Sequence, residues 1–298
     1  MKIQFLKRED IDKTKWNSCV HFAHNGNIFG YMWYLDNVAK EWDALVEGDY
    51  ESVFPLIGRT KYLGVKELYQ PLLMRECGLY SSHQVTPQRS NAFLEAIPAE
   101  YKVLDIHLNE QQQLETANYP KWKLTQQKNH QLYLLKSYDD IALKYTPATV
   151  QKLEQGWMDN LIPSNAIKPE QIVDFWKKYT KNRQELDRSY HAYLRIMYNL
   201  LHRGWGNGAA ILDSKQNILG VNFFVYSHSK VMRLLSAYSP EGIKKGADLL
   251  QYDLLIRNHA GKPFILDFNT SEDFPLAYGA EATFYQKIQR DNRKWKIF

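Results

Sequence analysis

The fold is decided by the stretch Trp42–Pro71, which reads WDALVEGDYESVFPLIGRTKYLGVKELYQP. A second stretch, Ala209–Pro240, reads AAILDSKQNILGVNFFVYSHSKVMRLLSAYSP and ends in the same Tyr-x-Pro pattern. In both, apolar runs are separated by turn-rich or polar segments, which is typical of antiparallel strands. The predicted strands are 42–46, 51–57 and 65–69 in the first stretch and 210–212, 218–226 and 231–238 in the second.

The segments that follow the two meanders also match in order. The first meander leads to a predicted helix at Pro87–Ala96 and a strand at Tyr101–Leu108. The second leads to a helix at Gly246–His259 and a strand at Pro263–Phe268. Apolar segments suited to closing strands come next, at 121–124 and 132–135 in the first half and 283–288 in the second. A repeated order of elements predicts a repeated architecture.

Helical sequence precedes the second meander. Ile172, Phe175, Trp176 and Tyr179 recur at helical spacing and form one apolar stripe. A second helix, with apolar residues from Tyr193 to Leu201, is predicted to end near Gly204. The fold class is therefore α+β, with two domains in tandem at 1–142 and 143–298, each a mixed, mostly antiparallel sheet flanked by helices. We expect the boundary within 139–149.

Composition narrows the class of protein. The 298 residues are 44% hydrophobic and 24% charged, which suits globular domains. We find no signal peptide and no stretch near the roughly 18 apolar residues of a membrane span, and the two cysteines form no disulfide framework. These features predict a cytoplasmic protein. A net charge of +5 allows an anionic ligand but is too small for a dedicated DNA-binding protein.

The loop after the second meander has features of a phosphate site. It reads Ser-Pro-Glu-Gly-Ile-Lys-Lys-Gly-Ala over 239–247 and leads into a predicted helix. Helix N-termini present free amides to anions, Gly242 and Gly246 allow close approach, and Lys244 and Lys245 add positive charge. A solvated loop is the alternative interpretation. The corresponding loop of the first half, 71–78, lacks this pattern, so we expect a phosphorylated donor in the second half.

The order of elements is that of the GNAT acyltransferase fold, and the sequence resembles the Fem-type branch of that superfamily over nearly the whole chain. The residues that carry the resemblance are Asp49-Tyr50, Phe54-Pro55-Leu56, Tyr69-Gln70-Pro71, Gly246–Leu255, Leu266-Asp267-Phe268 and Tyr278-Gly279-Ala280. The resemblance implies two GNAT-like domains, the first structural or acceptor-binding and the second holding an acyl donor. It also implies transfer of an amino acid from aminoacyl-tRNA, or of an acyl group from acyl-CoA, to an amine. This amine acceptor would be a cell-wall precursor or a small molecule.

This resemblance implies a mechanism of direct attack by an amine. The donor would lie beside Ala237, Tyr238, Gly242, Lys244, Lys245, Gly246 and Ala247, with its carbonyl on backbone amides near Ala237 and Tyr238. A carboxylate would accept the proton of the amine, Asp267 as first choice and Glu272 as second. Tyr278 or Tyr285 would protonate the leaving group. The alternatives are that Asp267 binds the turn after it and that both tyrosines are core or rim residues.

Two departures leave the function open between classes. The turn 269–273 reads Asn-Thr-Ser-Glu-Asp where the family often has a small, glycine-containing turn, and lysines interrupt the donor loop. A non-catalytic binding protein that retains the fold is therefore the alternative to an N-acyltransferase, and the donor is either acyl-CoA or aminoacyl-tRNA. The segment Cys19–His24 has metal-ligand residue types but no second set at ligand spacing, so we expect no metal.

Overall fold

Two compact units make up the chain. The computed structural model describes residues 2–61, 64–114, 122–180 and 183–293, and for 183–188 the backbone alone. Unit 1 comprises residues 1–128 and 284–298, and unit 2 comprises residues 129–283. The predicted boundary between residues 142 and 143 thus lies inside unit 2, and the C-terminal segment returns to unit 1. The chain passes between the units at residues 128–129 and 283–284, each time within a long strand. No change in composition marks either position in the sequence.

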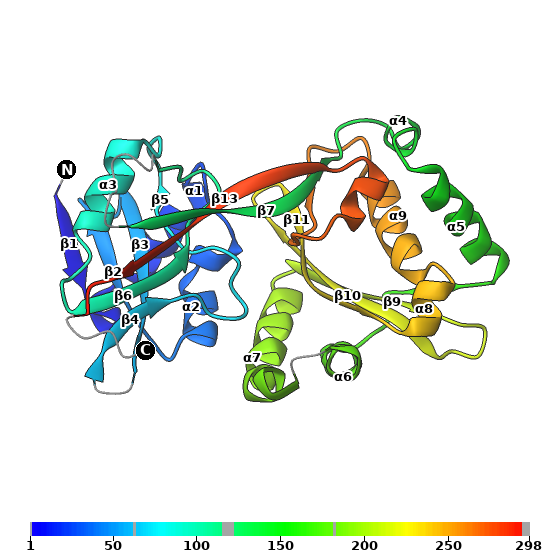
Figure 1. Cartoon of the computed structure of the whole chain (residues 1–298), viewed down its shortest axis with the longest axis horizontal. Coiled ribbons are helices and arrows are strands. Elements are labelled where there is room, and N and C mark those ends of the chain that lie inside the picture. Colours follow the sequence, from blue (N-terminus) through cyan, green and yellow to red (C-terminus); the bar gives the residue numbers. More distant parts are fainter. Residues whose placement is uncertain (1, 62–63, 115–121, 181–182, 294–298) are drawn as a thin grey trace. The chain divides into compact units, whose positions relative to one another are not determined.

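Unit 1 is a mixed sheet with helices on both faces (Figure 1). Its strand order is β1-β2-β3-β4-β6-β13, and among the described residues only β4 and β6 run parallel. Trp16 of α1 packs on Trp42 of β2, whereas Phe93 of α3 packs with Leu45 on the other face. Its elements are β1 (Ile3–Leu6), η1 (Arg8–Asp10), α1 (Lys13–Phe22), η2 (Ile28–Gly30), α2 (Met32–Val38), β2 (Glu41–Glu47), β3 (Ser52–Thr60), β4 (Lys66–Tyr69), β5 (Tyr80–Ser81), α3 (Pro87–Glu95), β6 (Tyr101–His107) and residues 284–291 of β13 (Glu281–Asp291).

Unit 2 repeats this arrangement with the strand order β8-β9-β10-β11-β12-β7. Here β11 and β12 are the parallel pair. Helix α9 contacts β9 and β10 on one face, and α6 and α7 cover the other (Figure 1). Its elements are residues 129–133 of β7 (Lys123–Tyr133), α4 (Tyr138–Ala142), α5 (Pro147–Met158), β8 (Ile162–Ser164), α6 (Pro169–Tyr179), α7 (Arg183–His202), β9 (Gly206–Leu212), β10 (Ile218–Ser227), β11 (Lys230–Tyr238), α8 (Pro240–Lys244), α9 (Ala247–His259), β12 (Ile265–Asp267) and η5 (Phe274–Tyr278).

The mixed α/β fold and the order of both meanders are confirmed, but the closing strands differ from the prediction. Residues 129–133 of β7 pair with β12 in unit 2, and β13 pairs with β6 in unit 1. Each half of the chain therefore supplies the closing strand of the other unit. The two segments predicted at 121–124 and 132–135 belong to one strand over 123–133, and residue 121 lies outside the described residues. Strand partners depend on distant residues, so local pattern does not reveal them.

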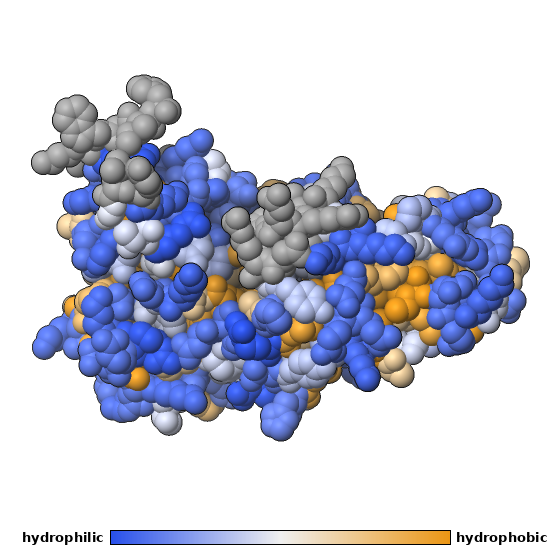
Figure 2. Space-filling view, turned by 90° about the horizontal axis from the view of Figure 1, so that it is seen from below, coloured by the Kyte–Doolittle hydropathy of each residue, from blue (hydrophilic) through white to orange (hydrophobic). Residues whose placement is uncertain are grey.

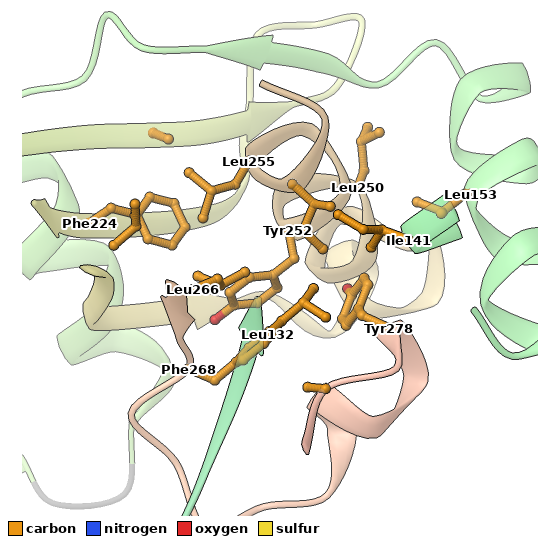
Figure 3. Packing of buried hydrophobic residues seen from close by; sticks show 14 of the residues in the cluster. Leu132, Ile141, Leu153, Phe224, Leu250, Tyr252, Leu255, Leu266, Phe268 and Tyr278 are labelled. Atoms are coloured by element: carbon orange, nitrogen blue, oxygen red, sulfur yellow. The ribbon is translucent and has the colours of Figure 1, made fainter. Parts of the chain in front are cut away.

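The core of unit 2 is an aromatic cluster between the sheet and α9. Figure 3 shows the rings of Tyr252, Phe268 and Tyr278 gathered beside Leu132 and Leu266. The Tyr252 and Phe268 ring centroids are 5.2 Å apart, and those of Phe268 and Tyr278 are 5.9 Å apart. Aromatic pairs at this spacing add to the stabilisation from buried area. The cluster fixes α9, β12 and η5, which border the candidate site.

Most of the visible surface is hydrophilic. Figure 2 shows hydrophobic areas on one face that are interrupted by hydrophilic residues. Within the described residues, no helix combines the length and the apolar character needed to cross a membrane.

Both cysteines lie in the interior of unit 1. Cys19 is 5% exposed and Cys77 is 1% exposed. Burial raises the pKa of the Cys19 thiol to about 12 and also raises the pKa of the Cys77 thiol. Since the thiolate is the reactive form, we expect neither thiol to react with dithionitrobenzoate in the native protein at about pH 8. Both should react in concentrated urea, and rapid reaction of either native thiol would contradict this packing.

Candidate functional site

The candidate site lies where strands β11 and β12 part. Their parallel pairing joins Lys230–Met232 to Ile265–Asp267, and β11 then continues through Arg233 to Tyr238. On its other edge, β11 stays paired with β10, and Ala237 lies opposite Val221. The register between β10 and β11 shifts at Arg233–Leu235, which marks a β-bulge. This is the predicted divergence of the third meander strand from the strand after the helix.

Asp267 lies at the point of divergence, as predicted, but its carboxylate is fully engaged there. The residue has no exposed surface. Oδ1 accepts hydrogen bonds from Asn129 Nδ2 at 3.0 Å and from the Asn269 amide at 2.9 Å, and Oδ2 accepts one from Gln131 Nε2 at 3.3 Å. This geometry matches the alternative interpretation, in which the aspartate fixes the turn after its strand.

Arg233 and Asn269 bridge the start of the divergence. Arg233 Nη2 donates to the Asn269 carbonyl at 3.0 Å, and Asn269 Nδ2 donates to the Arg233 carbonyl at 3.0 Å. Asn269 has a φ of +47°, a conformation that asparagine tolerates better than most residues. Its side chain thus binds a carbonyl of β11 just beyond the last paired residue, Met232.

A cluster of buried and partly buried polar residues lies between the sheet and α9, next to the divergence. We call it the α9 polar cluster, and it consists of Asn222, Arg233, Ser236, Tyr238, Asp248, Gln251 and Tyr252. Asn222 Nδ2 donates to the Tyr238 hydroxyl at 2.5 Å. Arg233 Nη1 lies 3.2 Å from Ser236 Oγ and 3.4 Å from the Tyr252 hydroxyl, which joins the sheet to the helix. Burial raises the pKa of Tyr238 well above its ordinary value.

Three oxygen atoms of this cluster have no hydrogen-bond partner among the described residues. They are Asn222 Oδ1, Asp248 Oδ1 and Gln251 Oε1. Asn222 is 0% exposed and Gln251 is 5% exposed. Burial raises the pKa of the Asp248 carboxyl. Because buried polar atoms in native proteins are nearly always bonded, each of these atoms is a place where an ordered water or another donor would bind.

The predicted donor loop is largely a packing element. A Cβ at Gly242 would lie 2.3 Å from the Leu219 carbonyl oxygen, and one at Gly246, whose φ is +76°, would lie 3.1 Å from the Lys152 carbonyl oxygen of α5. Residues 240–244 form the separate helix α8, and α9 begins at the fully buried Ala247. Close packing against the backbone therefore explains why both positions are glycine without a ligand.

The two lysines of the loop differ in their surroundings. Lys245 Nζ lies 2.8 Å from Glu241, and this hydrogen bond raises the pKa of the lysine. Lys244 is exposed, and no ion pair to a described residue is recorded for it. Lys244 is thus the more accessible cation for a donor.

The other predicted residues are spread over the chain. Tyr278 is fully buried in the core of unit 2, where its hydroxyl donates to the Leu249 carbonyl at 3.2 Å. Glu272 is exposed in the turn after Asp267. Tyr285 belongs to unit 1, where its ring centroid lies 5.5 Å from that of His107. Glu272 therefore lies in the turn that follows Asp267, whereas Tyr278 lies in the core and Tyr285 in the other unit.

Sequence reasoning missed most of the α9 polar cluster. Asn222 interrupts an otherwise apolar strand, and Asp248, Gln251 and Tyr252 recur at helical spacing in a helix that is mostly buried. A polar residue within a buried apolar run is the signal that marks such positions. We found no group of three or more potential metal ligands in the described part of the chain.

The corresponding place in unit 1 is filled by its own chain. The parallel pairing of β4 and β6 ends at Tyr69 and Asp105. Beyond it, the His107 amide donates to Gln70 Oε1 at 3.0 Å and the Cys77 amide donates to the His107 carbonyl at 2.7 Å. The segment after β4 thus bonds to the end of β6.

Two hollows lie elsewhere. One of about 490 Å³ in unit 1 is lined by charged residues of both signs around Trp42 and Tyr101. One of about 310 Å³ in unit 2 is lined by Leu132, Tyr133, Leu135 and Ile141, with lysines at its rim. Gln131 also lines the second hollow and donates to Asp267.

Comparison with solved structures identifies the fold. FemX is similar, with a TM-score of 0.64 and 11% identity over 98% of each chain. A conserved protein of unknown function from Bacteroides thetaiotaomicron has a TM-score of 0.59 and 10% identity over 97% of this chain and 99% of its own. L-PGS from Bacillus licheniformis has a TM-score of 0.55 and 12% identity over 95% of this chain and 93% of its own. No protein-family model and no curated protein matches the sequence. The chain therefore shares the fold of FemX.

Proposed function

We propose that the protein is an N-acyltransferase that moves an acyl or aminoacyl group to an amine acceptor by direct attack. The observation that carries this proposal is the divergence of β11 from β12 beside the α9 polar cluster, in a chain with a Fem-like fold. In such an arrangement the edge of β11 beyond Arg233, which pairs with no described strand on that side, would bind a donor, and polar groups beside it would orient the acyl carbonyl. We place the donor in unit 2, with Ala237 and Tyr238 on the diverging strand.

The donor is acyl-CoA or aminoacyl-tRNA. Helix α5 packs on the loop before α9, which leaves less room for a pyrophosphate than the sequence suggested. Asp248 in the first turn of α9 also makes the electrostatic potential there less positive. Lys244 and Lys245 remain the cations beside the helix. The acceptor is an amine on a small molecule or a cell-wall precursor, and Glu272 is an exposed carboxylate in the turn after Asp267.

Transfer itself tests the proposal. The full chain is incubated with radiolabelled acetyl-CoA or alanyl-tRNA and a peptide that carries one free amine. We expect label on the amine with one donor and no label on the same peptide after the amine is acetylated. Absence of transfer from both donors, with protein that melts cooperatively, would contradict catalysis with these donors and this class of acceptor.

A double substitution, Lys244→Ala with Lys245→Ala, tests where the donor binds. We expect binding of the productive donor to weaken by about two- to thirtyfold, since each exposed ion pair contributes roughly 0.2–1 kcal/mol. Calorimetric titration at two salt concentrations measures the effect. A steep salt dependence identifies tRNA, because many phosphate contacts release counterions, whereas CoA has few. Equal affinity of the variant and the wild type would place the donor elsewhere.

A non-catalytic binding protein is the second candidate. The engaged carboxylate of Asp267 and the packing role of Gly242 and Gly246 favour it, because both remove residues that the catalytic interpretation used. Saturable binding of a donor without transfer to any amine is the outcome that this function predicts.

A further inference from the structure

The hollow of unit 2 is lined largely by apolar side chains. Its volume of about 310 Å³ is near the lower end of the range for small-ligand sites. Leu132 and Ile141, which Figure 3 shows in the core cluster of unit 2, line it and are 5% and 2% exposed. Tyr133 and Leu135 line it as well, although they are 55% and 68% exposed. A ligand with an apolar part would remove this surface from water.

Two lysines line the same hollow. Lys136 and Lys144 are exposed, and neither ammonium group has an ion pair or a hydrogen bond to a described residue. The stem of Lys144 packs on Gly279, because a Cβ at that glycine would lie 2.5 Å from Lys144 Cβ and 3.0 Å from its Cδ. Gly279 also lines the hollow. The stem of Lys144 is therefore held against one wall of the hollow, while its ammonium group stays available to a ligand.

The charges around the hollow favour a ligand with one negative charge. Glu281 is the one acid among the described residues that line it, so two lysines and one glutamate leave the lining with a net charge of +1 at neutral pH. A phosphate monoester would bring up to two negative charges beside Glu281, and an ammonium would be repelled by both lysines. A single carboxylate matches the balance best.

We propose that this hollow binds a medium-chain carboxylate, that is, one unbranched alkyl chain that ends in one carboxylate group. The chain would cover Leu135 and Ile141, and the carboxylate would pair with Lys136 and Lys144. The site goes beyond the proposed function and does not depend on it, because the carboxylate is bound without making or breaking a bond.

Probes that differ in one feature test the site. Octanoate is compared with 1-octanol, which has no charge, with octylammonium, which has the opposite charge, with octyl phosphate and with the shorter hexanoate. Binding is followed by the methyl signals of Leu135 and Ile141 in carbon-edited NMR spectra of the full chain. We expect octanoate to bind about two- to thirtyfold more tightly than 1-octanol, which is the range that two exposed ion pairs supply. Hexanoate should bind up to about fifteenfold more weakly than octanoate, because it buries two fewer methylenes.

A double substitution, Lys136→Gln with Lys144→Gln, removes both charges and keeps long side chains. We expect octanoate to lose its advantage over 1-octanol, while 1-octanol binds as it does to the wild type. Lys215→Gln with Lys262→Gln is the matched control, since both are exposed lysines of unit 2 that do not line the hollow. Octanoate should bind to this control as it does to the wild type.

Two single substitutions test the opposing charge and the apolar wall. Glu281→Gln removes a repulsion, so octanoate should bind about 1.5- to fivefold more tightly. Leu135→Gln should weaken octanoate and 1-octanol alike, and because this side chain is 68% exposed, the core does not depend on it. Thermal melts show whether each variant is folded.

Every outcome decides the proposal. Equal affinity for octanoate and 1-octanol, or an octanoate affinity that survives the double substitution at Lys136 and Lys144, overturns the carboxylate site. Tighter binding of octylammonium or octyl phosphate than of octanoate overturns it and assigns the hollow to a cation or to a phosphate. Unchanged methyl signals with every probe overturn it as well, and a dimer that Leu135→Gln then dissociates in sedimentation would show that a second copy of the chain covers the hollow. Acyl transfer is measured with other ligands, so its failure leaves the carboxylate site standing.

Discussion

Asp267→Ala is expected to lower the free energy of unfolding by about 3 kcal/mol or more, because it leaves buried donors without an acceptor. The side chain is fully buried and accepts hydrogen bonds from Asn129, Gln131 and the Asn269 amide. These contacts join β7, β12 and the following turn. Asp267→Asn retains one acceptor and should show a smaller loss. Urea unfolding followed by circular dichroism measures both.

Glu272 provides the matched control. It lies in the same turn but is exposed, so Glu272→Ala should change stability by less than about 0.5 kcal/mol. If Glu272 is the base, the variant loses transfer while it remains stable. Conversely, an Asp267→Asn protein with unchanged stability and unchanged donor affinity but a lower rate of transfer would identify Asp267 as the catalytic base.

Gly242→Ala is expected to destabilise the protein by about 2–3 kcal/mol. The new methyl carbon would lie 2.3 Å from the Leu219 carbonyl oxygen, which belongs to the backbone of β10 and has little freedom to move. The clash would separate α8 from the start of β10. Thermal unfolding in the presence and absence of donor measures the change.

Ile243→Ala is the control that separates a loss of packing from a change in helix propensity. This side chain is 48% exposed, so Ile243→Ala should leave stability nearly unchanged. If Gly242 were retained for close approach of a phosphate, Gly242→Ala would weaken donor binding with no change in melting temperature. That result would restore the sequence-based interpretation of the loop.

The local elements were largely predictable because their residues act on near neighbours. The apolar runs separated by turn residues gave both meanders, and the predicted helices at 87–96 and 246–259 agree with α3 and α9 to within about one residue at each end. The strand after each helix was also predicted, and the structure adds that it runs parallel to the last meander strand. Strands and helices of this kind follow from period and turn chemistry.

The candidate site was predictable only in part. The divergence of two strands followed from the resemblance in element order, and Asp267 does lie beside it. The environment of each side chain did not follow. Tyr278 and Tyr285 have the same residue type and lie seven positions apart, yet one is a core residue of unit 2 and the other a half-buried residue of unit 1. Burial depends on residues that are distant in sequence, which a local pattern does not contain.

The sequence by itself determined the two meanders, their following helices and the Fem-like order, since each depends on residue spacing within about thirty positions. Only the tertiary structure decided that β13 pairs in unit 1, that β7 pairs in unit 2 and that Asp267 is enclosed by three donors. It also decided that Asn222 and Gln251 are buried, although both are polar. Strand pairing and hydrogen bonding between distant segments depend on which surfaces meet when the chain folds, and that is a property of packing rather than of local sequence.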